Sequence, residues 1–422
     1  MQIEVVTIGD ELLLGFTVDT NAAHLARQLA AQGVAIVRRS TCGDEAHEIA
    51  AAVREALDRT GAVITTGGLG PTSDDLTKES IAAIFGRGMH RDESIVENLK
   101  ERWKKRGWPG DLPVANLQQA MVPDGCEILT NNHGSAPGIW LEDERGRWVA
   151  MLPGVPREMR GMLADTLLPR ITARLSAGAE APRVIASRTL RTSGIAESAL
   201  ADKLGPLAKA PFGLSLAYLP GVEGVDLRLT SRGRTAAEAE PVFAQATAAI
   251  HELVGHNIYG EGNDDLAALV LDEMRARHIT LALAESCTGG LLGARITAIP
   301  GSSDVLLGGV VAYANAVKRS MLGVREATLA TFGAVSEETA REMALGARER
   351  IGADAALSIT GVAGPGGATP GKPVGHTCFG VALGGDVHTF TMNLYGDRAE
   401  IRERAAQAAL FALRRALAKP AS

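Results

Sequence analysis

Ala284-Glu-Ser-Cys-Thr-Gly-Gly290 joins two segments of different character. Residues 279–283 form a short apolar run, which predicts a buried strand, and residues 291–299 have the composition of a helix. In α/β sheets such strand-to-helix turns lie at the carboxyl ends of the strands, where ligands bind, and the free N–H groups of the new helix attract anions. Ser286 is therefore either a simple helix cap or a hydroxyl held beside a phosphate or an oxyanion.

The composition indicates an ordinary multidomain α/β protein. The chain has 422 residues, which is more than one hydrophobic core usually supports, so two or three domains are expected. Hydrophobic residues make up 46% and charged residues 22%, and many of the 48 glycines lie between apolar runs. The net charge is −6 without a long block of one sign, which does not indicate a general binder of nucleic acids or membrane surfaces.

Cysteine usage and the first residues indicate a cytoplasmic protein. The four cysteines are scattered without the spacing of metal ligands, which suits a reducing interior. No basic segment precedes an apolar one at the N-terminus, and no stretch is long and apolar enough to span a bilayer. We therefore expect a cytoplasmic location and no membrane partner.

The first part of the chain alternates between strand and helix patterns. Strands are expected at residues 3–8, 34–39 and 62–65, and helices at 20–32 and 45–59. This βαβαβ order is typical of a doubly wound parallel sheet.

A glycine-rich loop follows the third expected strand. Gly67, Gly68, Gly70 and Thr72 are expected to bind a phosphate through backbone N–H groups and a hydroxyl. The adjacent pair Asp74-Asp75 could hold a divalent cation beside that phosphate. The alternative is that these aspartates only cap the next helix.

Several motifs of this region together resemble the N-terminal domain of the CinA family, which is similar to the molybdopterin-binding fold. The motifs are Gly9-Asp-Glu-Leu-Leu-Leu-Gly15, Asp19-Thr-Asn21, residues 65–77, Gly134-Ser-Ala-Pro-Gly138 and residues 152–159. The resemblance implies a phosphate-containing ligand and, in some members, metal-dependent hydrolysis of ADP-ribose. The divalent cation would be Mg, Mn or Co, and Asp10 and Glu158 are further candidate ligands beside the aspartate pair.

The middle of the chain is expected to form a small α+β module of roughly 80 residues, a size at which a domain can stand alone. It resembles the KH-like connecting domain of CinA proteins. No Gly-x-x-Gly loop joins two of its expected helices directly, so RNA binding is disfavoured and a spacer or dimer element is preferred.

In the last part of the chain, three loops follow expected strands, at Ser286, at residues 313–318 and at residues 360–367. If they converge, Lys318 could act as a base on the Ser286 hydroxyl, because serine–lysine pairs are a variant of the catalytic triad. Tyr313 would relay a proton or orient the pair. Each residue also has an ordinary explanation: a solvated lysine and a core aromatic residue are the commoner cases.

The same loops offer groups for binding charge. The N–H groups of Thr288 and Gly289 could stabilise an oxyanion, and Arg398 could bind a phosphate or the developing charge. A surface arginine is the alternative for Arg398. Cys287 is expected to point away from Ser286, and no histidine follows within the motifs to activate it.

The motifs of this part look like the PncC-type amidase domain that ends CinA proteins. They are residues 284–290, 311–318, 333–336, 359–367, 372–375 and 396–398. Members convert nicotinamide mononucleotide (NMN) and water to nicotinate mononucleotide and ammonia, without a cofactor. The resemblance places the catalytic residues at Ser286, Tyr313 and Lys318. The substrate-binding residues that it implies are Thr288, Gly289, Gly290, Asn315, Thr360, Gly361, Gly364 and Arg398.

The sequence therefore predicts three domains, at residues 1–172, 173–256 and 257–422. We expect an NMN amidohydrolase, with an additional ADP-ribose pyrophosphatase activity in the first domain. The alternative is a nucleotide-sensing or competence-linked protein that binds at one or both glycine loops without turnover. A homodimer is expected from the resemblance and from the general habit of such enzymes.

Overall fold

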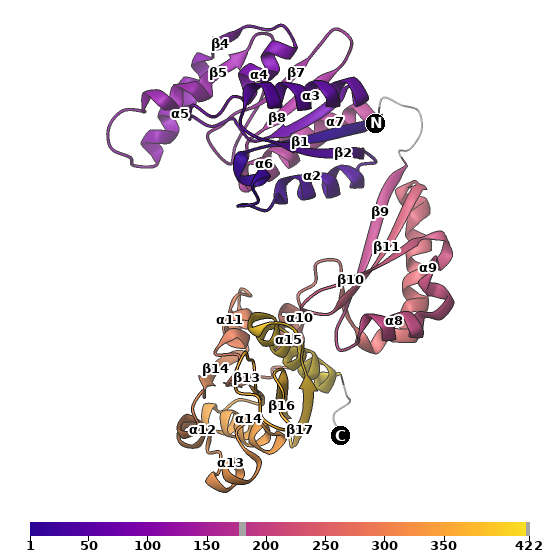
Figure 1. Ribbon diagram of the computed structural model, residues 1–422, viewed down its shortest axis with the longest axis vertical. Helices are drawn as coiled ribbons and strands as arrows, with labels where there is room; N and C mark the ends of the chain where they lie inside the picture. The colour runs from indigo at the N-terminus through magenta and orange to yellow at the C-terminus, as the bar shows by residue number, and fades with distance from the viewer. Residues whose placement is uncertain (177–182, 419–422) are drawn as a thin grey trace. The chain divides into compact units, whose positions relative to one another are not determined.

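The computed structural model describes residues 1–176 and 183–418. The chain divides into two compact units, Met1–Ala186 with Ser231–Glu240 and Ser187–Thr230 with Pro241–Ser422 (Figure 1). Within the described ranges, no helix combines the length and the apolar character needed to cross a bilayer.

Unit 1 is built on a six-stranded sheet in the order β2-β1-β3-β8-β7-β6. β2, β1, β3 and β8 are parallel, and at one edge β7 pairs antiparallel with both β8 and β6. The expected doubly wound α/β fold is confirmed, with this antiparallel edge added. The strands are β1 Gln2–Ile8, β2 Ala35–Cys42, β3 Ala62–Thr66, β6 Glu127–Leu129, β7 Gly138–Glu142 and β8 Trp148–Leu152.

Helices cover both faces of this sheet because its central strands are apolar on both sides. One core includes residues of α3, α4 and α5, and the other includes residues of α2 and α6. The helices are α1 Asp10–Leu13, α2 Thr20–Ala31, α3 Ala46–Thr60, α4 Thr77–Ile84, α5 Glu93–Lys105, α6 Pro156–Met162 and α7 Leu168–Ser176. A short antiparallel pair, β4 Met89–Arg91 with β5 Met121–Pro123, forms a separate two-stranded sheet.

The middle of the chain forms a four-stranded sheet in the order β10-β11-β9-β12. β10 and β11 form an antiparallel pair. β12 pairs with β9, so a strand of this sheet lies beyond residue 256, where we expected the domain to end. The domain boundaries themselves stay a prediction. The elements are β9 Val184–Thr192, α8 Glu197–Leu204, β10 Ser215–Pro220, β11 Val225–Arg234, α9 Ala236–Val254 and β12 Ile258–Glu261.

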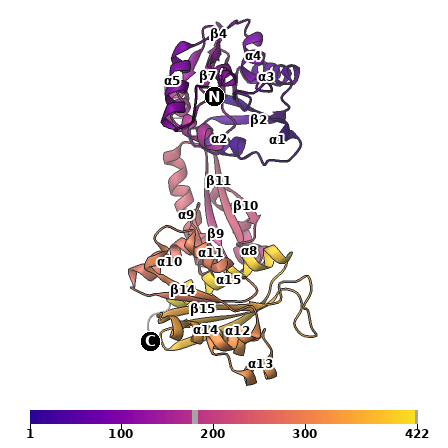
Figure 2. The ribbon, with the colours of Figure 1, turned by 90° about the vertical axis from the view of Figure 1, so that its left-hand side faces the viewer.

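The last part of unit 2 is a five-stranded sheet in the order β14-β13-β15-β16-β17. Figure 2 shows α12 and α14 on one side of this sheet and α10, α11 and α15 on the other. The strands are β13 Leu281–Glu285, β14 Leu306–Val311, β15 Ala355–Gly361, β16 His376–Leu383 and β17 Asp386–Asn393. The helices are α10 Leu266–Ala276, α11 Leu291–Thr297, α12 Asn315–Leu322, α13 Glu326–Phe332, α14 Glu337–Ile351 and α15 Arg398–Leu417.

The register of the parallel strands brings their carboxyl ends together. Glu285, the last residue of β13, pairs with Val311 of β14 and with Ile359 of β15. The loops that follow β13, β14 and β15 therefore leave the sheet at the same edge, as ligand-binding loops of open α/β sheets do.

Candidate active site

The turn after β13 holds Ser286 in a defined position. The N–H of Ser286 donates to the Ile359 carbonyl at 2.9 Å, and the N–H of Gly289 donates back to the Ser286 carbonyl at 3.0 Å. Gly289 and Gly290 have φ angles of 60° and 92°, which glycine adopts without strain. The Gly289 N–H, expected to bind an oxyanion, is thus used to close the turn.

Lys318 lies beside the Ser286 hydroxyl. Its side chain is 1% exposed, and its Nζ lies 2.9 Å from Ser286 Oγ and 2.7 Å from the carbonyl oxygen of Ala312. Burial lowers the pKa of Lys318 to about 8, because the charged form loses its hydration. Near neutral pH, part of the population therefore carries a neutral amine that can take a proton from the serine.

Tyr313 and Arg398 form a pair at the rim of the site. The Tyr313 side chain is 62% exposed, and its hydroxyl accepts a hydrogen bond from Arg398 Nη2 at 3.1 Å. Arg398 Nη1 also donates to the carbonyl of Gly364 at 2.6 Å. Tyr313 is thus not a core aromatic residue: it is largely exposed, and its hydroxyl is bonded to the arginine that holds the loop after β15.

The three loops enclose a cavity of about 210 Å³. Among the described residues, six that were predicted for the site line this cavity: Ser286, Lys318, Tyr313, Thr360, Gly361 and Arg398. The other lining residues are Cys287, Ala334, Val335 and Ala363. The lining does not include the predicted Thr288, Gly289, Gly290, Asn315 and Gly364. The Thr360 hydroxyl donates to the Ala334 carbonyl at 2.7 Å, so it fixes the loop before α14 against the cavity.

Glu285 is a residue of the site that the sequence interpretation missed. Its carboxylate is almost fully buried and accepts hydrogen bonds from the N–H groups of Gly290, Leu292 and Gly293 at 3.0, 3.1 and 2.8 Å. The start of α11 is therefore satisfied from within the protein. The expectation that these N–H groups attract a bound anion is wrong. The signal for this role in the sequence was an acidic residue at the end of an apolar strand, just before the turn into a helix.

Arg402 is a second missed residue. Its Nε and Nη2 donate to the Thr288 carbonyl at 3.2 and 2.7 Å. It follows Arg398 by four residues on α15, so both side chains lie on one face of the helix. That spacing was visible in the sequence, but the loops that the two arginines hold were not.

Cys287 is among the residues that line the same cavity. That its side chain points away from Ser286 stays a prediction. Cys287 also packs in the apolar core, and burial raises the pKa of its thiol to about 11. Cys287 is therefore a neutral wall residue, and Ser286 remains the candidate nucleophile.

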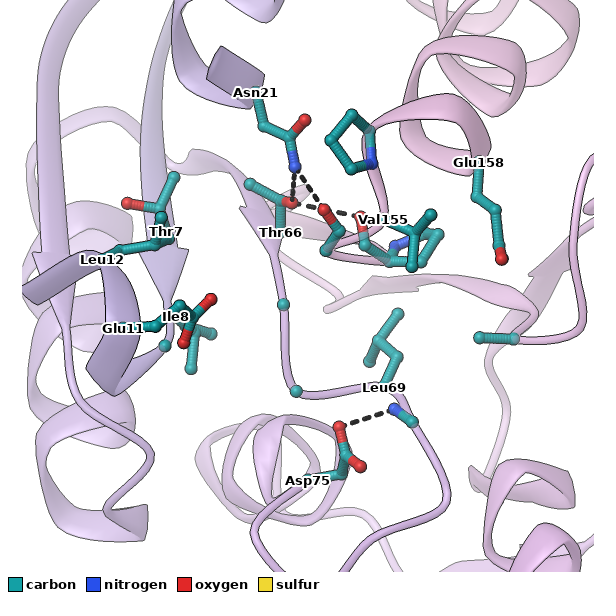
Figure 3. Close-up of a pocket in the computed structure, with 18 of the residues that line it drawn as sticks. Thr7, Ile8, Glu11, Leu12, Asn21, Thr66, Leu69, Asp75, Val155 and Glu158 are labelled. Carbon is teal, nitrogen blue, oxygen red and sulfur yellow. Dashed lines mark hydrogen bonds between the residues drawn. The ribbon is translucent and has the colours of Figure 1, made fainter. Parts of the chain in front are cut away.

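Unit 1 contains a larger cavity of about 590 Å³ at the glycine-rich loop (Figure 3). Gly67, Gly68 and Gly70 line it as predicted, together with Asp74, Asp75 and Glu158. Asp75 accepts hydrogen bonds from the N–H of Gly70 at 2.6 Å and from the N–H and hydroxyl of Thr72 at 2.8 and 2.5 Å. Asp75 therefore ties the loop together, and Thr72 serves as its partner.

The predicted metal ligands do not form a ready cage. Glu158 accepts from Asn131 Nδ2 at 2.6 Å, and Asp10 and Asp44 exchange bonds with each other's backbone N–H groups. Among the described residues, no three His, Cys, Asp or Glu side chains group closely enough to hold a metal ion.

Asp44 nevertheless lies in a negative environment. Burial raises its pKa, and the charges of Asp10, Glu11 and Asp74 raise it further. Glu11, Asp44 and Asp74 all line the cavity. Mg²⁺ is usually held by one or two carboxylates plus phosphate oxygens. These residues therefore fit a hard cation only if a bound phosphate completes its coordination.

Comparison with known proteins covers nearly the whole chain. Residues 4–173 match the family described as "Probable molybdopterin binding domain", residues 187–260 "Damage-inducible protein CinA KH domain" and residues 263–417 "CinA C-terminal domain". The chain is 63% identical to a CinA-like protein of Gemmatimonas aurantiaca, over 100% of this chain and 97% of that protein. It is 45% identical to a CinA-like protein of Frankia casuarinae, over 99% of this chain and 96% of that protein.

Solved structures match part of the chain. The competence/damage inducible protein CihA from Agrobacterium tumefaciens is 43% identical, covering 36% of this chain and 94% of that chain, with a TM-score of 0.35.

Replacing Glu285 by Gln tests its role at the start of α11. The amide retains one acceptor but presents N–H donors to backbone N–H groups, so we expect at least one bond to be lost. A bond to a charged group contributes about 1.5–3 kcal/mol, which corresponds to roughly tenfold or more in opening. Hydrogen exchange of residues 290–293 should accelerate by that factor in Glu285→Gln and remain unchanged in the exposed control Glu403→Gln. Equal protection in both variants would contradict the assignment.

Proposed function

Because this chain belongs to the CinA family, we propose that its C-terminal domain hydrolyses the carboxamide of NMN to nicotinate mononucleotide and ammonia. The observation that carries the proposal is the 2.9 Å contact between Lys318 Nζ and Ser286 Oγ, two residues that line the same cavity. A buried lysine with a lowered pKa is the base that such a serine requires.

The first half of the proposed reaction forms an ester on the serine. Neutral Lys318 takes the proton of the Ser286 hydroxyl while Oγ bonds to the carboxamide carbon. The tetrahedral intermediate then collapses, the C–N bond breaks, and the Lys318 ammonium passes its proton to the leaving nitrogen as ammonia departs.

The second half releases the acid. Lys318 takes a proton from a water molecule whose oxygen attacks the ester carbon. The bond to Oγ breaks, and the proton returns from Lys318 to Ser286 as the carboxylic acid product leaves. A serine, a lysine and water supply every proton transfer, so we propose that this domain uses no cofactor.

The size of the cavity supports a small reacting group. Pockets for whole ligands usually measure about 300–1,000 Å³, whereas this cavity measures about 210 Å³. It therefore accommodates the reacting end of a mononucleotide, with the rest directed towards the rim that carries Tyr313 and Arg398.

Ser286→Ala and Lys318→Met test the catalytic pair. We expect each variant to lower ammonia release from NMN by several orders of magnitude, because residues that act as one unit lose most of the rate when either is removed. Lys78→Met is the matched control, since Lys78 is also buried with a pKa lowered to about 8 but lies in unit 1. Full activity in Ser286→Ala would exclude this serine as the nucleophile.

The lowered pKa of Lys318 also predicts the pH dependence. The lysine must be neutral to accept the serine proton, so kcat/KM should fall as pH drops through about 8 and level off above it. An unperturbed lysine would place this limb near pH 10.4. We would measure kcat/KM for NMN from roughly pH 6 to 11, a range that includes both the lowered and the unperturbed lysine pKa. A limb at the unperturbed value would contradict a buried Lys318 base.

For unit 1 we propose binding and metal-dependent cleavage of ADP-ribose at the glycine-rich loop. The cavity of about 590 Å³, with a phosphate-type loop on one wall and carboxylates beside it, favours a nucleotide ligand. A divalent cation would be held by Asp74 and neighbouring carboxylates and would polarise the pyrophosphate. The alternative is a nucleotide sensor, which heat stabilisation by ADP-ribose without product formation would support.

Asp75→Ala and Asp74→Ala separate the loop from the cation. Asp75 holds Gly70 and Thr72, so its loss should weaken ADP-ribose binding about tenfold with or without a divalent ion. Asp74→Ala should leave binding in chelator unchanged but lower turnover with Mg²⁺. The exposed Asp111→Ala is the control. Calorimetry measures binding and product assays measure turnover. Unchanged binding and turnover in Asp75→Ala, or turnover that persists under chelation, would contradict the proposal.

A further inference from the structure

Two arginines on one face of α15 carry charge that no carboxylate neutralises. The partners of Arg398 are the Gly364 carbonyl and the Tyr313 hydroxyl, and the partner of Arg402 is the Thr288 carbonyl. Within residues 1–176 and 183–418, no ion pair joins either guanidinium to an acidic side chain. All of these partners are neutral, so two positive charges remain available to an anion.

The two arginines lie beside the Ser286 turn in different ways. Arg398 lines the cavity, whereas Arg402 is not among its lining residues and holds a carbonyl two residues beyond Ser286. Arg402 Nη2 would lie 3.7 Å from a Cβ added at Gly289, so its guanidinium rests against the nucleophile turn.

The other obvious anion site in this region is already filled. A helix N-terminus often binds phosphate, but the Glu285 carboxylate accepts from the first N–H groups of α11. A second anion there would meet like charge in a desolvated position. The arginine face of α15 is therefore the better place for the negative group of a substrate.

We propose that Arg402, together with Arg398, binds the phosphate of a phosphomonoester substrate and makes the enzyme prefer the mononucleotide to the nucleoside with the same amide. The charges match, since a phosphomonoester carries about −1.5 to −2 at pH 7. Guanidinium groups also present paired donors that suit phosphate oxygens. This inference rests on the proposed amidase function and names the group that gives its substrate preference.

Arg402 also positions the turn, and the two roles differ in their kinetic effect. A residue that only holds the Thr288 carbonyl would affect every amide substrate alike, because Ser286 moves with the turn. A residue that binds phosphate affects only the phosphorylated substrate. The ratio of kcat/KM for NMN to kcat/KM for nicotinamide riboside therefore isolates the phosphate contact.

The test compares Arg402→Met and Arg402→Lys with Arg404→Met. Arg404 lies on the same helix, but its guanidinium stacks on the Tyr395 ring at 3.9 Å. Arg404→Met therefore removes the same charge as Arg402→Met without removing a contact to the Ser286 turn. We expect Arg402→Met to lower the ratio roughly tenfold to a hundredfold, Arg402→Lys to restore part of it, and Arg404→Met to change it by less than about twofold. An unchanged ratio in Arg402→Met, or an equal fall in Arg404→Met, would overturn the proposal.

Inorganic phosphate separates this proposal from the proposed function. If the intact chain hydrolyses neither NMN nor nicotinamide riboside, the proposed amidase function is wrong. The anion site is then tested by phosphate binding alone. Phosphate should then slow hydrogen exchange of residues 286–293 in the intact chain and in Arg404→Met, but not in Arg402→Met. Equal protection in all three proteins, or protection in none, would overturn the anion site.

Discussion

The burial of one amine beside one hydroxyl is the constraint on which the rest of the C-terminal domain depends. An ammonium group removed from water is unstable unless acceptors surround it or its proton is lost. Lys318 has the Ala312 carbonyl and Ser286 Oγ within 2.9 Å, and burial lowers its pKa towards neutrality. The same desolvation that makes this lysine costly to bury makes it useful as a base.

Keeping that pair in place requires the surrounding loops to be rigid, and charged side chains provide this from two sides. Glu285 holds the start of α11 from beneath the turn, while Arg402 holds the Thr288 carbonyl from α15. These contacts also set where negative and positive charge lie in the site. The helix terminus is neutralised by a carboxylate of the protein, and the positive charge is left on α15, at the rim of the cavity.

In unit 1 an acidic side chain also holds a glycine-containing loop. Asp75 closes the glycine-rich loop through N–H groups and a hydroxyl, much as Glu285 closes the turn in unit 2. The sequence motifs assigned Asp75 to a ligand and gave Glu285 no role. In the structure each carboxylate instead holds the backbone of its own loop. Other carboxylates of unit 1 gather near Asp44, where burial and like charge raise the pKa of its carboxyl group.

The sequence by itself determined the order of strands and helices, the glycine loops and the residue types of the candidate pair, because these follow from local periodicity and turn chemistry. It placed Ser286, Lys318 and Thr360 on separate loops that could converge. Only the tertiary structure decided that they do, through the register of β13 with β14 and β15. It also decided the roles of Glu285, Arg402 and Asp75. Glu285 and Asp75 have partners only a few residues away, but whether a carboxylate turns towards nearby N–H groups or towards a ligand depends on how the finished loop is packed. The partner of Arg402 lies more than a hundred residues away, which no local pattern records.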